Sequence, residues 1–501
     1  MNRFHWLLVP LLSAFAALGA AVPATPNIVL VVADDLGWGD ASCYGGNALK
    51  TPRIDRLAHE GLRFTDAHST SATCTPSRYA LLTGEYPWRR PGTGILPGDA
   101  PLIIEPGRPT LPARLKRAGY ATGVVGKWHL GLGATNLDWN TEIKPGPLEV
   151  GFDHAFIMAA TGDRVPCVYV EDHRVAHLDP SDPIRVGYLA PFGDEPTGKT
   201  RPDLLSLHPS HGHDQTIVRG ISRIGFMTGG QSARWDDTTM SDTFRRKAEE
   251  FIGRHAGHPF FLYLALHEPH VPRVPHPRFA GKSGLGPRGD AILQADEAVG
   301  AVVDTIDRLG LAADTLVLFT SDNGAVLDDG YRDDAVAKAG NHRPNGPWRG
   351  GKYSKFEAGT RVPLLARWPG HIRPGTSAAL VCQVDFPATL AALAGLPPDR
   401  AASPDGRNLL PVLLGDSREG RDHLVEQGQG LALRERSWKY IPAAQGAVRL
   451  AQTGIETGNA PGPQLYDLEA DPGETRNLAA EQAGRVARLA GRLEALRRGA
   501  Q

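Results

Sequence analysis

The sequence predicts an α/β fold in which a large, mostly parallel central sheet is flanked by helices, with a smaller C-terminal α+β subdomain. Two apolar, β-branched runs, at 27–33 and 315–320, are typical of strands buried on both faces of a parallel sheet. Strands that alternate with helices favour parallel pairing. Further strand-like runs lie at 121–125 and 259–266, and helical stretches lie at 110–118 and 291–309.

The N-terminal residues 1–24 have the composition of a cleaved signal peptide. A basic start around Arg3 precedes an apolar run at 6–21 that ends in small residues. A membrane anchor would need about 20 apolar residues and a firmer stop. We therefore expect an exported protein, periplasmic or secreted, with no membrane attachment once the signal is removed. Cleavage after Ala21 and cleavage after Ala24 both fit.

The composition is that of an ordinary globular protein. Its 501 residues are 41% hydrophobic and 22% charged, which is enough to bury a large core. The 54 Lys and Arg residues against 55 Asp and Glu residues give a formal charge of −1. No overall field therefore attracts nucleic acid or an anionic membrane, and any binding of an anion has to be local.

Oxygen-rich pairs of residues follow two of the predicted strands at once. Asp34-Asp35 follow the first buried strand, and Asp322-Asn323 follow the strand at 315–320. Ligands of open parallel sheets gather at the carboxyl ends of strands, so both pairs can converge on one cation. Carboxylate and amide oxygens favour Ca²⁺ or Mg²⁺ over zinc, and calcium comes first because it tolerates irregular coordination. Each pair alone is also typical of a turn.

Candidate catalytic side chains follow two other predicted strands. Lys127 and His129 come directly after the strand at 121–125, and two residues apart they point to the same side of an extended segment. His270 lies in a Pro-His-x-Pro segment after the strand at 259–266. This pattern suits a lysine that binds an anion with a histidine base beside it. Taken alone, either motif is more typical of a solvated lysine or a hydrogen-bonded structural histidine.

Two glycine-bearing or irregular regions supply further candidates. From 132 to 237 the chain is rich in Gly, Pro, Asp and His, with one hairpin-like piece at 165–175, and long insertions of this kind build rims around sites. Its candidate substrate contacts are Asp163, Arg164 and the cluster His208-Pro-Ser-His211-Gly-His213, of which His211 is the first choice; Trp348 is a further candidate. In Arg349-Gly-Gly-Lys352 the glycines allow close approach of the backbone to a ligand, and Lys352 offers a point charge for an oxyanion.

After residue 415 the pattern changes to short strand-like runs, at 431–441 and 447–452, followed by a final helix. We therefore place a main domain at 25–417 and a subdomain, an antiparallel sheet plus a helix, at 418–501. The apolar residues of the final helix recur at spacings of three and four, which predicts a stripe that docks on the small sheet. They are Val486, Leu489, Leu493 and Leu496.

One sequence block connects the motifs described above. Cys74-Thr-Pro-Ser-Arg78, followed by a Leu-Thr-Gly element, resembles the maturation signature of the formylglycine-dependent sulfatases of the alkaline phosphatase superfamily. The motifs described above occur in the order expected for that family and span 27–369. The resemblance implies that a formylglycine-generating maturation enzyme oxidises Cys74 to an aldehyde, which is hydrated to a gem-diol. Among the remaining cysteines, Cys43, Cys167 and Cys382, one disulfide at most is then possible, and three buried thiols are the simpler expectation.

The resemblance also implies roles in sulfate ester hydrolysis. Residue 74 attacks sulfur through one diol hydroxyl and serves as a metal ligand with the two acidic pairs, while Arg78 holds it in place. Lys127, His270 and Lys352 bind the sulfate, and His270 acts as the general acid, assisted by Lys352. His129 takes the proton of the second hydroxyl, which expels sulfate and regenerates the aldehyde.

The expected substrate is a sulfated small molecule or saccharide. A sulfated carbohydrate is the first candidate, and an N-acetylgalactosamine 6-sulfate unit is one option within that class. Two other readings stay open at this point. A phosphate or phosphonate monoester hydrolase of the same superfamily would use related motifs, although an oxygen-only set for one metal favours sulfate. A catalytically silent, calcium-dependent glycan-binding protein would keep Cys74 as an inert thiol.

Overall fold

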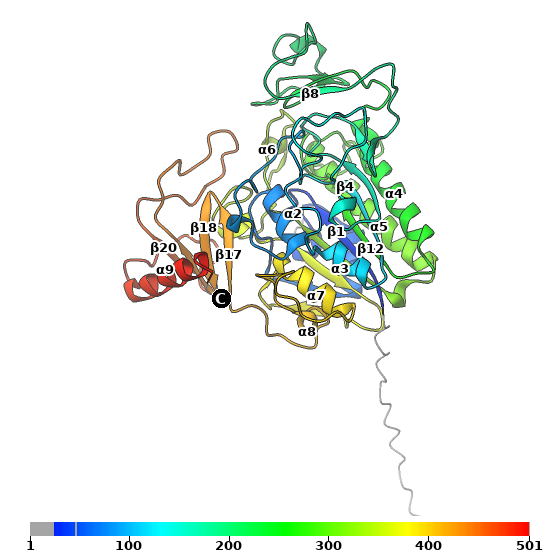
Figure 1. Ribbon diagram of the computed structural model, residues 1–501. Coiled ribbons are helices and arrows are strands. Elements are labelled where there is room, and N and C mark those ends of the chain that lie inside the picture. The colour runs from blue at the N-terminus through cyan, green and yellow to red at the C-terminus, as the bar shows by residue number, and fades with distance from the viewer. Residues whose placement is uncertain (1–24, 46–47, 500–501) are drawn as a thin grey trace, which may run out of the picture.

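The computed structural model describes residues 25–45 and 48–499, so the predicted signal peptide lies outside the described residues. Its centre is a ten-stranded sheet with the order β15-β2-β14-β13-β1-β12-β4-β5-β6-β7 (Figure 1). The parallel middle of this sheet confirms the predicted α/β class. Its strands are β1 (Asn27–Ala33), β4 (Ala121–Lys127), β5 (His154–Met158), β12 (Phe260–Ala265) and β13 (Thr315–Ser321).

Strand β1 lies between β12 and β13 and runs parallel to both, and β4 and β5 extend the parallel part beyond β12. Antiparallel strands complete both edges, apart from β15, which is parallel to β2. The hairpin predicted within 165–175 is the β6-β7 pair. The edge strands are β2 (Leu62–Phe64), β14 (Leu364–Arg367), β15 (Gly375–Ser377), β6 (Tyr169–Glu171) and β7 (Arg174–Val175).

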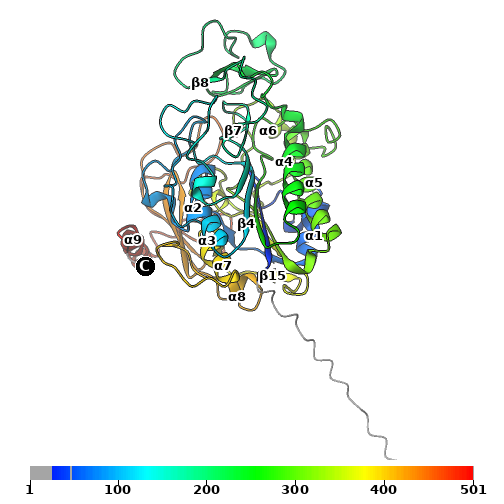
Figure 2. The same cartoon turned by 45° about the vertical axis from the view of Figure 1, so that its right-hand side comes forward.

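Helices cover both faces of the sheet, which is why its central strands are mostly apolar and almost entirely buried. Figure 2 shows α1, α4 and α5 on one side and α2, α3 and α7 on the other. Helix α5 begins before the predicted position 291 because Pro287, which reads as a breaker, is tolerated in a first turn. The bounds are α1 (Pro52–Glu60), α2 (Cys74–Thr83), α3 (Leu111–Arg117), α4 (Met240–Arg254), α5 (Gly286–Arg308) and α7 (Phe386–Leu393).

The C-terminal part is a four-stranded antiparallel sheet beside α9 (Ala483–Arg497), as predicted (Figure 1). Leu489, Leu493 and Leu496 of the predicted stripe are buried in one cluster with apolar residues of the sheet. The run 447–452 forms no strand; it makes only an isolated bridge. The boundary at 417 stays a prediction. The strands are β17 (His423–Gly428), β18 (Gly430–Glu435), β19 (Trp438–Ile441) and β20 (Gln464–Asp467).

The long segment between β4 and α4 has little regular structure, and β8 lies at the far end of the molecule in Figure 1. All four cysteines are free thiols. Among the described residues, none of the helices is both long and apolar enough to span a membrane. The remaining short elements are β3 (Ala67–His68), β8 (Arg185–Gly187), β9 (Ile217–Val218), β10 (Ile221–Ser222), β11 (Phe226–Thr228), β16 (Val381–Cys382), α6 (Ala335–Lys338) and α8 (Leu410–Leu413).

Candidate active site

Cys74 is the first residue of α2, and the Cys-Thr-Pro-Ser-Arg block forms the first turns of that helix. The turn is tied to the preceding segment because Ser77 Oγ donates to Ser71 O at 2.8 Å and accepts from Ser71 N at 3.2 Å. Cys74 Sγ lies 3.5 Å from Asp34 Oδ1. Burial raises the pKa of the Cys74 thiol well above its usual value, so the unmodified side chain would be a poor nucleophile.

The pairs Asp34-Asp35 and Asp322-Asn323 meet at the carboxyl edge of the sheet because β1 and β13 are parallel neighbours, with Ala33 opposite Ser321. Asp35 N donates to Asp322 Oδ1 at 3.3 Å, and Asn323 Nδ2 donates to Asp35 Oδ1 at 2.7 Å. The structure thus brings together four of the five side chains that the sequence predicts as metal ligands, and the fifth, Cys74, lies beside Asp34.

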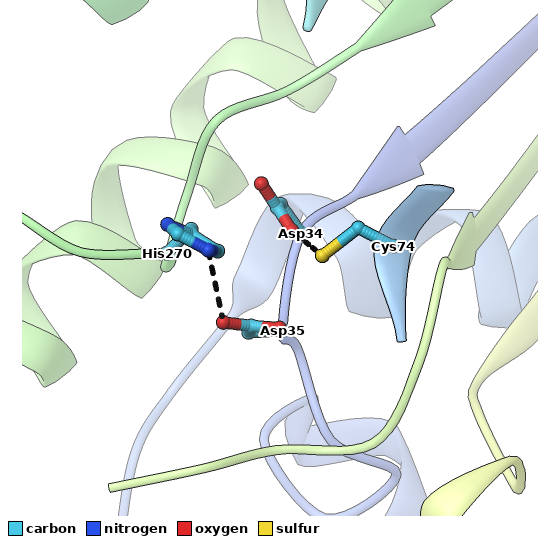
Figure 3. A group of neighbouring side chains, drawn as sticks. All are labelled: Asp34, Asp35, Cys74 and His270. Atoms are coloured by element: carbon cyan, nitrogen blue, oxygen red, sulfur yellow. Dashed lines mark hydrogen bonds and ion pairs between the residues drawn. The ribbon is translucent and has the colours of Figure 1, made fainter. Parts of the chain in front are cut away.

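Four side chains from three segments converge on one point of this edge (Figure 3). A potential ligand atom from each of Asp34, Asp35, Cys74 and His270 lies within 4.8 Å of the others. Asn323 Oδ1 is buried and has no hydrogen-bond partner among the residues that the structure describes. Carboxylate oxygens with an unpartnered amide oxygen beside them fit a hard divalent cation.

Buried cations neutralise these carboxylates. Lys127 Nζ donates to Asp34 Oδ2 at 2.5 Å, and Lys352 Nζ donates to Asp35 Oδ2 at 2.9 Å. Burial nevertheless raises the pKa of Asp34, and repulsion by Asp322 and Asp35 adds to the effect of burial. Burial also acts to raise the pKa of Asp35, but Lys352 and Lys127 outweigh it and hold that pKa below its usual value. The pKa values of the two neighbouring carboxyls therefore move in opposite directions, although each carboxyl lies beside a lysine.

His129 lines the site and has a free lone pair on Nδ1. Its backbone is left-handed, with φ of 56°, and Thr75 Oγ1 donates to its carbonyl at 3.0 Å. Nε2 lies 3.0 Å from Leu96 O, which can only accept, so Nε2 carries the proton and Nδ1 is the acceptor. Nδ1 is buried without a partner in the described part of the chain. Burial and the nearby Lys127 lower the pKa of His129 well below its usual value, so the ring is neutral.

His270 has the opposite tautomer. Its Nδ1 donates to Val271 O at 2.7 Å, and Nε2 faces Asp35 Oδ2 at 3.7 Å. Burial, then Lys352 and Lys127, lower the pKa of His270 well below its usual value. His267, the other histidine of this segment, is buried and packs 5.8 Å from the His270 ring, centroid to centroid.

A pocket opens above residue 74. Asp163 and Arg164 line it as predicted candidates for substrate contact, while His211 lies outside its lining and His213 inside it. His213 Nε2 lies 2.9 Å from Asp163 Oδ2, and Arg164 Nη1 donates to the same oxygen at 2.9 Å. The complete lining is Cys74, Ile95, His129, Asp163, Arg164, His213, Ile224, His270, Asp329, Lys352 and Tyr353.

His213 belongs to the histidine cluster that the sequence indicates as a candidate for substrate contact. Two polar lining residues, Asp329 and Tyr353, are not indicated by the sequence analysis. Tyr353 directly follows Lys352, which was a usable signal. Asp329 stands in an Asp-Asp-Gly turn, which by itself indicates only a surface loop.

Comparison with known proteins gives this geometry a family. The Sulfatase family model matches residues 26–396. N-acetylgalactosamine-6-O-sulfatase of Bacteroides thetaiotaomicron is 51% identical over 94% of this chain and 93% of its own length, and human arylsulfatase A is 34% identical over 95% and 87%. A solved structure from work on glycosaminoglycan metabolism by Bacteroides thetaiotaomicron has a TM-score of 0.94 at 50% identity, with 95% of this chain and 100% of that chain covered. The predicted resemblance is confirmed: this chain belongs to the sulfatase family and is a sulfuric ester hydrolase.

Proposed function

We propose that this sulfatase removes sulfate from a sulfated glycan, with 6-sulfated N-acetylgalactosamine as the first candidate. The observation that carries the proposal is the 51% identity with the Bacteroides thetaiotaomicron N-acetylgalactosamine-6-O-sulfatase, which extends along nearly all of both chains. The pocket supports a saccharide, because Asp163, Arg164 and His213 form a buried polar group beside the sulfate site. Such a group suits the hydroxyls of a sugar ring.

We propose that residue 74 is converted to formylglycine and that Ca²⁺ is the bound cation, held by Asp34, Asp35, Asp322, Asn323 and residue 74. When present, the two groups supply an oxygen nucleophile and a positive charge beside the sulfate. Mg²⁺ is the second choice of cation, because it demands a more regular octahedral arrangement.

The side chains of this chain then divide the work. Lys127 is paired with Asp34 and Lys352 with Asp35, and their two ammonium groups are proposed to bind the sulfate oxygens. His270 Nε2 faces the same space and is proposed to protonate the departing oxygen. Lys352 and Lys127 lower the pKa of His270. The negative charge of a bound sulfate acts in the opposite direction and so favours the protonated ring.

His129 is proposed as the base of the second half-reaction. The hydrogen bond from Nε2–H to Leu96 O keeps the proton on Nε2 and leaves a lone pair on Nδ1. Nδ1 can therefore accept a proton without a change of tautomer. The two histidines thus have opposite proton-transfer roles, and each has its second ring nitrogen anchored on a backbone carbonyl.

The experiment is a screen of defined sulfated saccharides with protein expressed together with a formylglycine-generating enzyme. We expect the highest kcat/KM for N-acetylgalactosamine 6-sulfate. A preference for the 4-sulfate, or for the 6-sulfate of the gluco epimer, would contradict the proposed substrate. Intact mass checks the modification, since conversion replaces the CH₂SH group of Cys74 by CHO; the Cys74→Ala variant is the control.

We further propose that the protein is exported to the periplasm or secreted, on the strength of the signal peptide predicted at 1–24. N-terminal sequencing of protein from the culture medium and the periplasm tests this proposal. A mature N-terminus after Ala21 or Ala24 is expected, and full-length protein confined to the cytoplasm would contradict it.

A further inference from the structure

Lys352 is bound by a second carboxylate that the proposed mechanism does not use. Its Nζ donates to Asp35 Oδ2 at 2.9 Å and to Asp329 Oδ2 at 2.7 Å. Lys352 is only 2% exposed, so its charge needs a compensating partner. Asp35 is a predicted ligand of the cation, which competes for its oxygens. Asp329 is therefore the partner that stays with Lys352 when the cation is bound.

Tyr353 holds Asp329 from the other side. Its hydroxyl donates to Asp329 Oδ1 at 3.0 Å, so each oxygen of this carboxylate has its own donor. The backbone of Tyr353 is left-handed, with φ of 74°, and its N–H donates to Ala72 O at 2.7 Å, two residues before Cys74. The lysine, its anion and the nucleophile segment thus form one hydrogen-bonded unit.

The turn that carries Asp329 is itself anchored. Ser210 N donates to Gly330 O at 2.9 Å, and Arg332 N donates to His208 O at 2.9 Å. Tyr331 Oη donates to Ser222 O at 2.7 Å. The long segment between β4 and α4 therefore fixes the turn, although it lies far away in the sequence.

An ammonium group has three N–H bonds. Asp35 and Asp329 take two of those of Lys352, and the third is left for the pocket that Lys352 lines with Cys74 and His270. We propose that Asp329 and Tyr353 are positioning residues that direct the third N–H of Lys352 at the departing oxygen of the sulfate ester. The lysine then stabilises negative charge that builds on this oxygen as the S–O bond breaks.

This inference rests on the proposed contact between Lys352 and the sulfate ester, and its test is the dependence of rate on the leaving group. A series of aryl sulfates from 4-nitrophenyl sulfate to 4-methylphenyl sulfate varies the charge on the departing oxygen and carries no sugar. The outcome is therefore independent of the glycan proposed above. Asp329→Asn keeps the shape of the side chain and removes its charge, and Tyr353→Phe removes one hydrogen bond.

We expect kcat of Asp329→Asn to fall about 10- to 100-fold on 4-methylphenyl sulfate and much less on 4-nitrophenyl sulfate, because a misdirected donor matters most for the poorer leaving group. Tyr353→Phe should show the same trend more weakly. Tyr466→Phe, which loses the bond to Gln464 Oε1 on β20, is the matched control and should behave as wild type. Equal losses along the series in folded Tyr353→Phe, or no loss in either variant, would overturn the inference.

Discussion

Arg78 is paired with Asp322: its Nε donates to Asp322 Oδ2 at 2.9 Å, and its Nη2 lies 2.8 Å from the same oxygen as an ion pair. Arg78 is fully buried, and its Nη1 donates to Lys127 O at 3.1 Å. The Cys-Thr-Pro-Ser-Arg block therefore carries more than Cys74. Its arginine, one helical turn along α2, orients a predicted metal ligand on β13 and supports the strand end that carries Lys127.

Replacement of Arg78 by lysine should weaken calcium binding about 10- to 100-fold, as loss of an outer-shell partner of a metal ligand generally does. A lysine cannot reproduce the planar contact of Nε and Nη2 with Asp322. Titration calorimetry of purified protein with Ca²⁺ measures the change. Arg421→Lys is the control, because Arg421 is a buried arginine paired with Asp385 away from the site. An equal loss of affinity in both variants would point to a general effect of destabilisation.

Calcium binding should release a proton at neutral pH. Without a cation, burial holds the pKa of Asp34 above its usual value, so its carboxyl is protonated in the folded protein. A divalent cation requires the carboxylate, so affinity should fall about tenfold per pH unit below the pKa of Asp34. Calorimetry in buffers of different ionisation enthalpy measures the protons released. Binding with no proton release at pH 6 would contradict a protonated Asp34.

Asp34→Asn separates this effect from other titrations. The amide keeps an oxygen for the cation but has no proton to lose, so the release should disappear in this variant.

Chelation of the cation from wild type should abolish turnover and lower Tm, since the cation binds only the folded site.

A second pH effect is expected where the C-terminal part meets the main sheet. Glu474 is fully buried, and its Oε2 accepts from Glu357 N at 2.8 Å. Burial raises the pKa of Glu474 to about 8, with repulsion by Glu357 and Glu426 partly offset by Lys439. Because the folded state holds this proton more tightly than the unfolded state, the contribution to stability is present below the ordinary pKa of 4.5 and is lost as pH rises towards 8.

Glu474→Gln should therefore raise Tm by about 2–4 °C at pH 8.5 and leave it unchanged at pH 4.5. The amide keeps the acceptor for Glu357 N without a charge to bury. Thermal unfolding of the two proteins across this pH range gives the comparison. Glu481→Gln is the control, since Glu481 is exposed and pairs only with Arg476 at the surface. A difference in Tm that does not grow with pH would refute the assignment.

The centre of the fold and the floor of the site follow from local sequence patterns. Strands β1 and β13 are buried at every position and mostly apolar because both faces are covered, and parallel neighbours end at the same edge. The proximity of Asp35 and Asn323 follows from these two facts alone. The six-motif resemblance then supplied roles that no spacing indicates.

The walls of the pocket could be predicted only in part: Asp163 and Arg164 were candidates, but the arrangement of the other lining residues has no local signal. Asp329 and His213 lie in segments without periodicity, and their positions depend on contacts such as the bridge between Pro209 and Tyr331. Such pairing between segments more than 100 residues apart leaves no local signal. His211 and His213 are chemically alike in the sequence, and only the backbone path places the second one on Asp163.

His129→Ala should separate the two half-reactions. The variant keeps Lys127, His270 and Lys352, so the alcohol should still leave, but the proposed base, whose Nδ1 has a free lone pair, is missing. We expect a burst of about one alcohol per active site, followed by turnover slowed by about 10²- to 10⁴-fold. Rapid-quench measurement of alcohol and sulfate shows this difference, and intact mass should find sulfate retained on the protein. His211→Ala, whose side chain lies outside the pocket lining, is the matched control and should turn over without a burst. Equal and simultaneous release of alcohol and sulfate by His129→Ala would instead assign the second proton transfer to another group.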